Sequence, residues 1–325
     1  MPRDAVLAFA FVQKSPRASY ATAARASGHR STGQQWLFDG ARLTSRSDET
    51  GIMDEQQRKA TLKQTFDAVS SGYDGGALRF FPQSAQSMVS LLDLRGDEHA
   101  LDVACGTGHA SLAVARMLPN GRVTGVDFSA GMLDQARRKA AAQGIGNIDF
   151  LERDMTALGF PADSFDVALC AFGIFFVDDL DTQLAHLASV VKPRGKVMIS
   201  SFQEAHYFHP LREMMLARLS THAIAIPPPN WKRVGHEGAC RALFDRAGLT
   251  NTRVETRNVG YYLDCAERWW DVIWNAGFRR LISLLPEDAR ERFKRDHLQE
   301  IEALVTKDGI WLDVGVLYTV GTKPA

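Results

Sequence analysis

The sequence feature that most constrains the fold is a short apolar run that ends in a glycine-rich turn and passes directly into a helical pattern, His99 to Ser111 (HALDVACGTGHAS). Glycines let a backbone approach a ligand closely, and the first turn of a helix presents amides that have no partner within the helix. Open parallel sheets bind their ligands where the strands end, at the point where the strand order reverses. The segment therefore predicts a nucleotide-type cofactor site at the edge of a parallel sheet.

Short apolar runs bounded by turn signals alternate with helical patterns along the middle of the chain. Strands separated by single helices indicate a parallel sheet that is covered on both faces and connected by right-handed crossovers. We therefore expect a doubly wound α/β fold, in which Ser129 caps one of the helices and Gly144 ends it. The expected strands are residues 99–104, 123–127, 148–153, 165–171, 196–201, 252–263 and 310–320.

The alternation of strands and helices breaks down after Phe202. Helices are expected near residues 210–219 and 238–247, and a long Trp-rich helical stretch over residues 267–307 separates the last two strand candidates. So long a connection between two strands indicates a helical cap inserted over one end of the sheet. We expect cap insertions at about residues 203–250 and 267–308.

The first 46 residues differ in composition from the rest of the chain, with seven basic side chains against Asp4 and Asp39 and many Ser and Ala. This composition fits an organelle transit peptide or a weak secretory signal, and it equally fits a disordered extension before a start at Met53. We expect a disordered leader over residues 1–52 and one folded domain over residues 53–325.

Charge and cysteine content argue against several classes of protein. Lys+Arg and Asp+Glu both number 38, which removes any overall attraction to nucleic acid. The four cysteines form no CxxC pair and the histidines form no HExxH motif, so neither a disulfide framework nor a metal site is expected. No apolar run approaches the roughly 18 residues that span a bilayer. We expect a cytoplasmic protein, with organelle import left open if residues 1–46 are a transit peptide.

Acidic side chains near the expected strand ends separate this site from a dinucleotide site. The turn reads ACGTG and then HAS, so the GxGxxG pattern lacks its first and last glycines. Asp102 lies inside the strand, where its charge would repel a pyrophosphate and attract an amino group. Asp127 ends the second strand, 21 residues after Gly106, and can accept hydrogen bonds from both hydroxyls of a ribose. Asp154 closes the third strand.

Four ordered motifs resemble those of class I S-adenosylmethionine-dependent methyltransferases, and most closely the subgroup that contains the ubiquinone and menaquinone biosynthesis methyltransferases. The motifs are LDVACGTG at 101–108, VTGVDFSAGML at 123–133, ERDMTALGFPADSFDVALCAFG at 152–173 and VVKPRGKVMIS at 190–200. The resemblance covers roughly residues 60 to 202 and implies a Rossmann-like, seven-stranded, mostly parallel sheet whose last strand is antiparallel. We expect the methyltransferase domain to extend over residues 53–325. S-adenosylmethionine is the cofactor that it implies.

The resemblance also carries roles to individual positions of the glycine turn. Gly106 and Gly108 are expected under the methionine part of the cofactor, with Asp102 directed toward its amino end. Asp127 is expected to hold the ribose. Ala104 stands where the family often has glycine, and this departure weakens the match only slightly.

The remaining cofactor contacts follow from the same resemblance. Phe128 and Met132 are expected beside the adenine ring, and Asp154 and Met155 at its edge. Ala171, at the end of the fourth strand, would offer its carbonyl oxygen to the methionine amine.

The reaction itself asks little of the protein beyond placement, because a sulfonium is already an activated methyl donor. Holding the methyl group and its acceptor in line can lower the barrier by about 7–11 kcal/mol. An oxygen or carbon acceptor must also lose a proton, for which a base is useful. The candidates are Tyr73, in the family-like segment FDAVSSGYD, and His206 and His209, which can also be ordinary packed loop residues.

Aromatic side chains follow the fourth strand, where the resemblance places the opening of the substrate pocket. Phe172, Phe175 and Phe176 lie there, and Trp274 lies in the expected cap. They predict either an apolar substrate pocket or core packing between cap and sheet.

The sequence therefore favours a methyltransferase that acts on a small, apolar or aromatic molecule. The alternatives are a methyltransferase that acts on a macromolecule, a pseudo-enzyme that binds the cofactor without turnover, and an NAD-dependent oxidoreductase. The sequence leaves the acceptor and the oligomeric state open.

Overall fold

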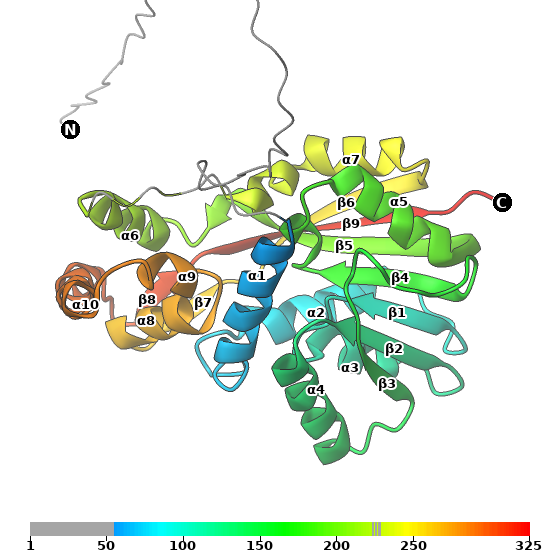
Figure 1. The fold of residues 1–325 in the computed structure, drawn as a ribbon, viewed down its shortest axis with the longest axis horizontal. Coiled ribbons are helices and arrows are strands. Elements are labelled where there is room, and N and C mark those ends of the chain that lie inside the picture. The colour runs from blue at the N-terminus through cyan, green and yellow to red at the C-terminus, as the bar shows by residue number, and fades with distance from the viewer. Residues whose placement is uncertain (1–54, 223, 225, 227–228) are drawn as a thin grey trace, which may run out of the picture. The chain divides into compact units, whose positions relative to one another are not determined.

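A computed structural model describes residues 55–222, 224, 226 and 229–325, so the leader expected over residues 1–52 lies outside the described part. Its centre is a seven-stranded sheet with the order β3-β2-β1-β4-β5-β9-β6 (Figure 1). Strand β9 runs antiparallel to both of its neighbours, whereas the other pairs are parallel. The strands are β1 (His99–Val103), β2 (Arg122–Asp127), β3 (Ile148–Glu152), β4 (Phe165–Ala171), β5 (Val191–Tyr207), β6 (Thr250–Asn258) and β9 (Val314–Thr322). The Rossmann-like, doubly wound sheet with one antiparallel strand is confirmed.

The strands at the centre of the sheet are buried on both faces. Four consecutive residues of β1, from Ala100 to Val103, are buried, and so are four in β4, from Val167 to Cys170. Such continuous buried runs are typical of strands with helices on both sides. The strand order reverses between β1 and β4, which places the glycine-rich turn after β1 at the switch point of the sheet.

The helices cover the two faces as right-handed crossovers require. Helices α3 (His109–Ala115) and α4 (Ala130–Ala142) connect β1 to β2 and β2 to β3, and therefore share one face. Helix α5 (Leu180–Val190) connects β4 to β5 in the opposite direction and covers the other face, beside α7 (Glu237–Arg246) (Figure 1). The hydroxyl of Ser129 accepts a hydrogen bond from the Met132 amide at 3.1 Å, so it caps α4 as predicted. Gly144, just after α4, adopts a left-handed φ of +64°.

The last two predicted strands are each divided in the structure. Residues 252–263 form β6 and a separate β7 (Tyr261–Leu263), and residues 310–320 form β8 (Ile310–Leu312) and β9. Strands β7 and β8 pair with each other in a second, two-stranded sheet. The chain leaves the main sheet at Gly260, where a Cβ atom would lie only 2.6 Å from the carbonyl oxygen of Leu312. Hydropathy does not reveal such a break, because the close approach of Gly260 to Leu312 depends on residues about 50 positions apart in the sequence.

The expected cap insertions contain helices with two different positions. Helix α10 (Glu287–Glu302) packs on both α6 (Leu211–Ser220) and α8 (Ala266–Asn275), and the short α9 (Arg279–Ile282) packs on α8. Together with β7 and β8 they lie past the carboxyl ends of the parallel strands (Figure 1). Helix α7, which falls within the first expected insertion, instead packs against β6 and β9. It belongs to the helical layer of the sheet, and its assignment to the cap was wrong.

Two helices precede the sheet. Helix α1 (Glu55–Val69) packs against α4, and α2 (Phe80–Leu91) packs against α3 and β9. Within the described residues, no helix is both long enough and apolar enough to cross a membrane.

Candidate cofactor and substrate site

The glycine-rich turn begins where β1 ends and contains three residues with left-handed backbones. Ala104, Gly106 and Gly108 have φ angles of +55°, +56° and +82°. A Cβ atom added at Gly106 would meet no heavy atom within 4 Å, so the space beside this residue is open. One added at Gly108 would lie 3.0 Å from the Cβ atom of Ala136 and 3.2 Å from the Phe150 ring. Gly106 therefore leaves room for a ligand, whereas Gly108 lets the start of α3 pack closely on α4 and β3.

Asp102 lies fully buried in β1, beneath this turn. Its Oδ2 atom accepts a hydrogen bond from the Ser111 hydroxyl, while its Oδ1 atom has no hydrogen-bond partner among the described residues. Burial raises the pKa of Asp102 to about 7, partly offset by the bond from Ser111, and the nearby charge of Asp127 adds to the rise. A buried carboxylate oxygen without a partner is costly. The site therefore has one unused acceptor suited to a cationic or N–H donor.

Asp127 is the last residue of β2, the strand next to β1, and is also buried. Its two carboxylate oxygens accept hydrogen bonds from the amides of Ser129 at 2.9 Å and Gly106 at 2.8 Å. Burial raises its pKa, although these amides favour the charged form. A carboxylate has about four lone-pair directions, so two acceptor positions remain for further donors.

The residues expected around an adenine ring lie next to α1. The Asp154 carboxylate accepts hydrogen bonds from the amide and hydroxyl of Thr156 and is 2.9 Å from the Lys59 ammonium. These bonds outweigh its partial burial and lower its pKa. The Phe128 carbonyl oxygen accepts a hydrogen bond from the Lys63 ammonium at 2.6 Å. Sequence reasoning missed both lysines, because nothing in the pattern of an amphipathic helix says which strand end it will cover.

Three further residues predicted to contact the cofactor are wholly or partly buried, and one of them already accepts a hydrogen bond from another side chain. The Met132 side chain is 1% exposed. The Met155 carbonyl oxygen accepts a hydrogen bond from the Gln183 side chain at 2.9 Å. Ala171 ends β4 and is half-buried. Their contacts with a cofactor remain predictions.

A polar group that sequence analysis did not find lies at the start of α3. The Asp74 carboxylate accepts a hydrogen bond from the Thr107 hydroxyl at 2.7 Å and lies 2.8 Å from His109 Nε2. Its other oxygen lies 2.9 Å from the Lys139 ammonium. These bonds outweigh partial burial and lower the pKa of Asp74 to about 2. Asp74, Thr107, His109 and Lys139 are called the Asp74 cluster below. The sequence feature that could have identified Asp74 is the family-like segment FDAVSSGYD, in which Asp74 directly follows Tyr73.

The aromatic residues predicted for the substrate pocket divide into two groups. Phe172 and Phe175 are buried and Phe176 is half-buried, all directly after β4, with Phe175 and Phe176 in the short 3-10 helix η1 (Ile174–Phe176). Trp274 belongs to the cap, where it stacks on Trp270 with the ring centroids 6.1 Å apart. The Arg279 guanidinium lies over the Trp274 ring at 4.5 Å. This environment gives no support for placing Trp274 with the phenylalanines.

The three candidate bases lie in different places. Tyr73 stacks on Phe81, with the ring centroids 4.8 Å apart. Burial and the neighbouring charge of Asp127 raise its pKa well above the ordinary value, so its phenol keeps its proton at neutral pH. His206 and His209 are 47% and 62% exposed and pair with Asp313 at 2.8 Å and Glu213 at 3.1 Å. Tyr73 lies near the predicted cofactor site, because the charge of Asp127 acts on it and the adjacent Asp74 bonds Thr107 of the glycine-rich turn.

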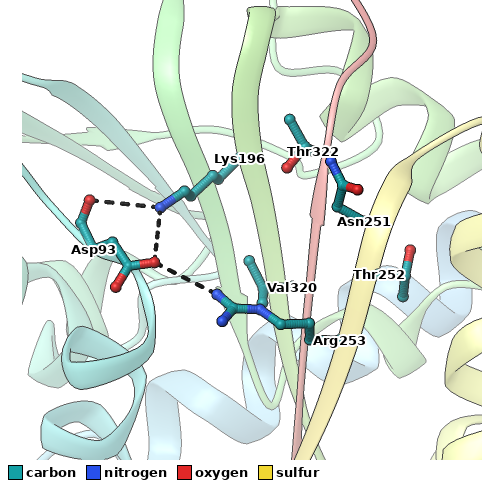
Figure 2. A pocket seen from close by; sticks show the side chains of 7 residues that line it. All are labelled: Asp93, Lys196, Asn251, Thr252, Arg253, Val320 and Thr322. Carbon is teal, nitrogen blue, oxygen red and sulfur yellow. Dashed lines mark hydrogen bonds and ion pairs between the residues drawn. The ribbon is translucent and has the colours of Figure 1, made fainter.

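A polar surface pocket lies at the opposite end of the sheet. Figure 2 shows Asp93, Lys196 and Arg253 facing one another in it, with the Asp93 carboxylate 3.4 Å from the lysine and 3.5 Å from the arginine. Lys196 pairs with Val167 near the start of β4, whereas the glycine-rich turn follows the end of β1. This pocket is therefore separate from the predicted cofactor site. In the described residues, no group of three or more His, Cys, Asp or Glu side chains could hold a metal ion.

The switch-point turn and the two buried carboxylates beside it define a Rossmann-like protein with a site for a nucleoside cofactor. A family profile described as a methyltransferase domain matches residues 100–195. Aklanonic acid methyltransferase DauC from Streptomyces sp. (strain C5) is 31% identical over 150 residues, which cover 46% of this chain and 68% of that protein. Nocamycin O-methyltransferase from Saccharothrix syringae is 26% identical over 275 residues, which cover 80% of this chain and 98% of that protein.

The fold is shared with solved structures. The YcgJ protein from Bacillus subtilis superposes with a TM-score of 0.51 at 21% identity, covering 75% of this chain and 99% of its own. The chain belongs to the class I S-adenosylmethionine-dependent methyltransferases. Its cofactor is S-adenosylmethionine, and the NAD-dependent alternative is wrong.

The described residues fit this cofactor. The open space at Gly106 can take the methionine chain, and the unpartnered oxygen of Asp102 is a suitable acceptor for an amino group. The remaining acceptor positions of Asp127 suit hydroxyl donors.

Proposed function

We propose that the protein transfers the methyl group of S-adenosylmethionine to a small apolar or aromatic molecule, which binds against half-buried aromatic side chains beside Asp127. The support from relatives is that the names of two of them specify aklanonic acid and nocamycin, both small molecules. A macromolecular acceptor has no comparable support.

The observation that carries this proposal is a group of aromatic rings from separate parts of the chain that keep some exposed surface. The Phe66 ring lies 5.4 Å from Phe176, 6.3 Å from Phe128 and 6.4 Å from Tyr73, centroid to centroid. Tyr73 in turn stacks on Phe81. Each of these rings is only partly buried, in contrast to the fully buried core aromatics behind them. Apolar walls with few polar groups are typical of small-molecule sites.

We assign the cofactor contacts as the sequence predicts. Asp127 would accept hydrogen bonds from the ribose, and Asp102 would face the amino group of the methionine part. When bound, the sulfonium supplies an activated methyl group. The protein then contributes mainly by orientation and by excluding water, which together can account for about 7–11 kcal/mol of barrier lowering.

Proton removal, where the acceptor needs it, has one candidate near the cofactor site. The candidate is Tyr73, but burial and the charge of Asp127 raise its pKa, which makes its phenol a hydrogen-bond donor and a poor base. His206 and His209 each pair with a carboxylate. We propose that Tyr73 orients the acceptor, and that acceptors with an acidic hydroxyl or carbon are methylated fastest.

Radiolabelled S-adenosylmethionine incubated with the protein and separate panels of acceptors tests the proposal. We expect label in organic-extractable products from hydroxylated aromatic or quinone-type molecules. Label that enters only tRNA or peptides would contradict the proposed acceptor class.

A variant of the aromatic group tests where the acceptor binds. Phe176→Ala should raise KM for the acceptor and leave the affinity for S-adenosylhomocysteine unchanged, because it shortens only the apolar wall. Phe160→Ala is the matched control, since Phe160 is also half-buried but packs on Phe165 at the start of β4. Equal effects of the two substitutions would place the acceptor elsewhere.

A further inference from the structure

Residues 70–76 follow α1 and carry Tyr73 and Asp74 across the start of the cofactor site. This segment is a series of turns held by backbone hydrogen bonds of 3.0 Å, from Gly72 to Val69, from Gly75 to Gly72 and from Leu78 to Gly75. Such short turns hold their own conformation weakly, so contacts with the rest of the protein decide where the segment lies.

The strongest polar contact of the segment is the Asp74 cluster. Its members come from three places: the segment itself, the glycine-rich turn with the first residue of α3, and the third turn of α4. The Lys139 ammonium bonds both the Asp74 carboxylate at 2.9 Å and the Thr107 hydroxyl at 3.1 Å. Asp74 and Lys139 are 28% and 21% exposed, so the pair is shielded from water more than a surface ion pair.

A second carboxylate anchors the chain just before the segment. Asp67, near the end of α1, accepts hydrogen bonds from the Ser129 hydroxyl and from the Gly131 amide at 3.2 Å. The chain from Asp67 to Asp74 therefore runs from the start of α4 to the start of α3. These two helices begin directly after Asp127 and after the glycine-rich turn, so this stretch of chain passes over both halves of the cofactor site.

Tyr73 lies at the Asp74 end of this crossing. Its ring lies between Phe66 and Phe81, and the charge of Asp127 acts on its phenol. On the cap side, the Arg279 guanidinium donates to the Ala68 carbonyl oxygen at 3.4 Å. The two ends of the crossing are therefore tied next to Asp127, through Ser129, and next to Gly106, through Thr107.

We propose that Asp74 is a positioning residue that holds residues 70–76 closed over the cofactor site, so that S-adenosylmethionine and S-adenosylhomocysteine exchange only when the Asp74 cluster opens. This inference rests on the cofactor alone and goes beyond the proposed acceptor. Asp67 and α1 remain attached during opening, because they bind α4 independently of Asp74.

Cofactor binding kinetics test this role without any acceptor, so the result is independent of the proposed acceptor class. Binding and release of S-adenosylhomocysteine are measured by stopped flow on the full chain and on Asp74→Asn. Loss of the charge-assisted bonds should raise both the association and the dissociation rate constants by about tenfold. The dissociation constant should change less than either rate constant.

Hydrogen exchange of the ligand-free protein gives a second readout. The amides of Gly72, Gly75 and Leu78 should exchange about tenfold faster in Asp74→Asn, because their hydrogen bonds open with the segment. Lys139→Gln removes the same contact from the α4 side and should reproduce both effects. It therefore serves as the test variant if Asp74→Asn folds poorly.

The matched control is Asp134→Asn. Asp134 also lies on the surface of this part of the protein and pairs with a basic residue, Arg137, at 3.0 Å, but it is 56% exposed and bonds within α4. It should leave both rate constants and the exchange of the three amides unchanged. The proposal is overturned if Asp74→Asn and Lys139→Gln leave the association rate unchanged or slow it, since an ordinary structural or affinity role predicts that result.

Discussion

Ala104 stands where the chain turns from β1 into the glycine-rich turn, with a left-handed φ of +55°. A left-handed backbone costs a residue with a Cβ atom about 1–2 kcal/mol relative to its right-handed form. Phe172, at the end of the neighbouring strand β4, has a similar φ of +53°. Strained backbones of this kind gather where a fold positions a ligand.

Ala104→Gly should therefore stabilise the protein by about 0.5–1 kcal/mol, because glycine adopts this conformation freely. Urea unfolding of the two proteins measures the difference. Ala113→Gly, in the middle of α3, is the control and should destabilise by about 1 kcal/mol. Destabilisation by Ala104→Gly would show that the methyl group contributes more by packing than the backbone loses by strain.

Asp102 gives the binding site a pH dependence. Burial raises its pKa to about 7 in the free protein, so a growing fraction is neutral as the pH falls below that value. A bound amino cation favours the ionised form, so binding must displace the proton at low pH. Affinity for S-adenosylhomocysteine should be highest above pH 7 and fall by up to about tenfold per pH unit below it.

Calorimetric titrations at pH 8, 7 and 6 check this, with Asp102→Asn as the comparison. The variant should bind more weakly at pH 8, and its affinity should decline less steeply because only Asp127, whose pKa is also raised, still titrates. Parallel pH profiles for the two proteins would remove Asp102 from the amino subsite.

At the scale of elements, the position of η1 depends on an arginine from a distant part of the chain. Arg233, in the 3-10 helix η2 (Asn230–Val234), donates hydrogen bonds to the carbonyl oxygens of Phe175 at 2.9 Å, Val177 and Asp178 at 2.6 Å. These carbonyls belong to η1 and the residues after it, where the proposed acceptor wall lies. A planar guanidinium can serve three acceptors at once, which an ammonium cannot do in the same geometry.

Arg233→Ala should therefore raise KM for the acceptor several-fold and lower stability by about 1–3 kcal/mol, while the affinity for S-adenosylhomocysteine stays the same. Steady-state kinetics and calorimetry separate these quantities. Lys232→Ala, which removes an exposed pair with Glu204, is the neighbouring control and should change neither. An equal loss of cofactor affinity in Arg233→Ala would show that η1 also shapes the cofactor site.

The elements differ in how well their sequence predicts them. Strands β1 to β4 are short runs rich in apolar residues, and their predicted bounds agree with the structure within one residue at each end. Strand β5 runs from Val191 to Tyr207, beyond both predicted ends at 196 and 201. Its pairing with β9 is interrupted by a register shift after Phe202 and resumes at Tyr207, and hydropathy does not predict this irregular extension. The division at Gly260 and the second sheet depend on a tertiary contact, and periodicity alone cannot reveal such a contact.

The residues of the candidate site likewise differ in whether the local sequence predicts them or only the folded structure reveals them. The glycine-rich turn, Asp102 and Asp127 could be found because they lie at the ends of successive strands. Lys59, Lys63 and Asp74 could not, because their partners are 33 to 97 positions away along the chain. The ring contact of Tyr73 with Phe66, and through Phe66 with Phe128 and Phe176, likewise arises only when α1 folds over the sheet.

For the molecule as a whole, every residue assigned to the site lies within residues 55–325. We propose that residues 53–325 form the methyltransferase domain. Protein that begins at Met53 should therefore keep the melting temperature and the cofactor affinity of the full chain. Differential scanning calorimetry of both proteins checks this, and a melting temperature several degrees lower would show that the leader contributes to the fold.

The central claim is that this Rossmann-like fold uses S-adenosylmethionine through Asp127 and the glycine-rich turn. Calorimetric titration with S-adenosylhomocysteine and with NAD tests it most directly, on the full chain, Asp127→Ala and the exposed control Asp149→Ala. We predict micromolar binding of S-adenosylhomocysteine, no binding of NAD, and a loss of about 1.5–3 kcal/mol in Asp127→Ala only. Absence of S-adenosylhomocysteine binding, tighter binding of NAD, or unchanged affinity in Asp127→Ala would contradict the account.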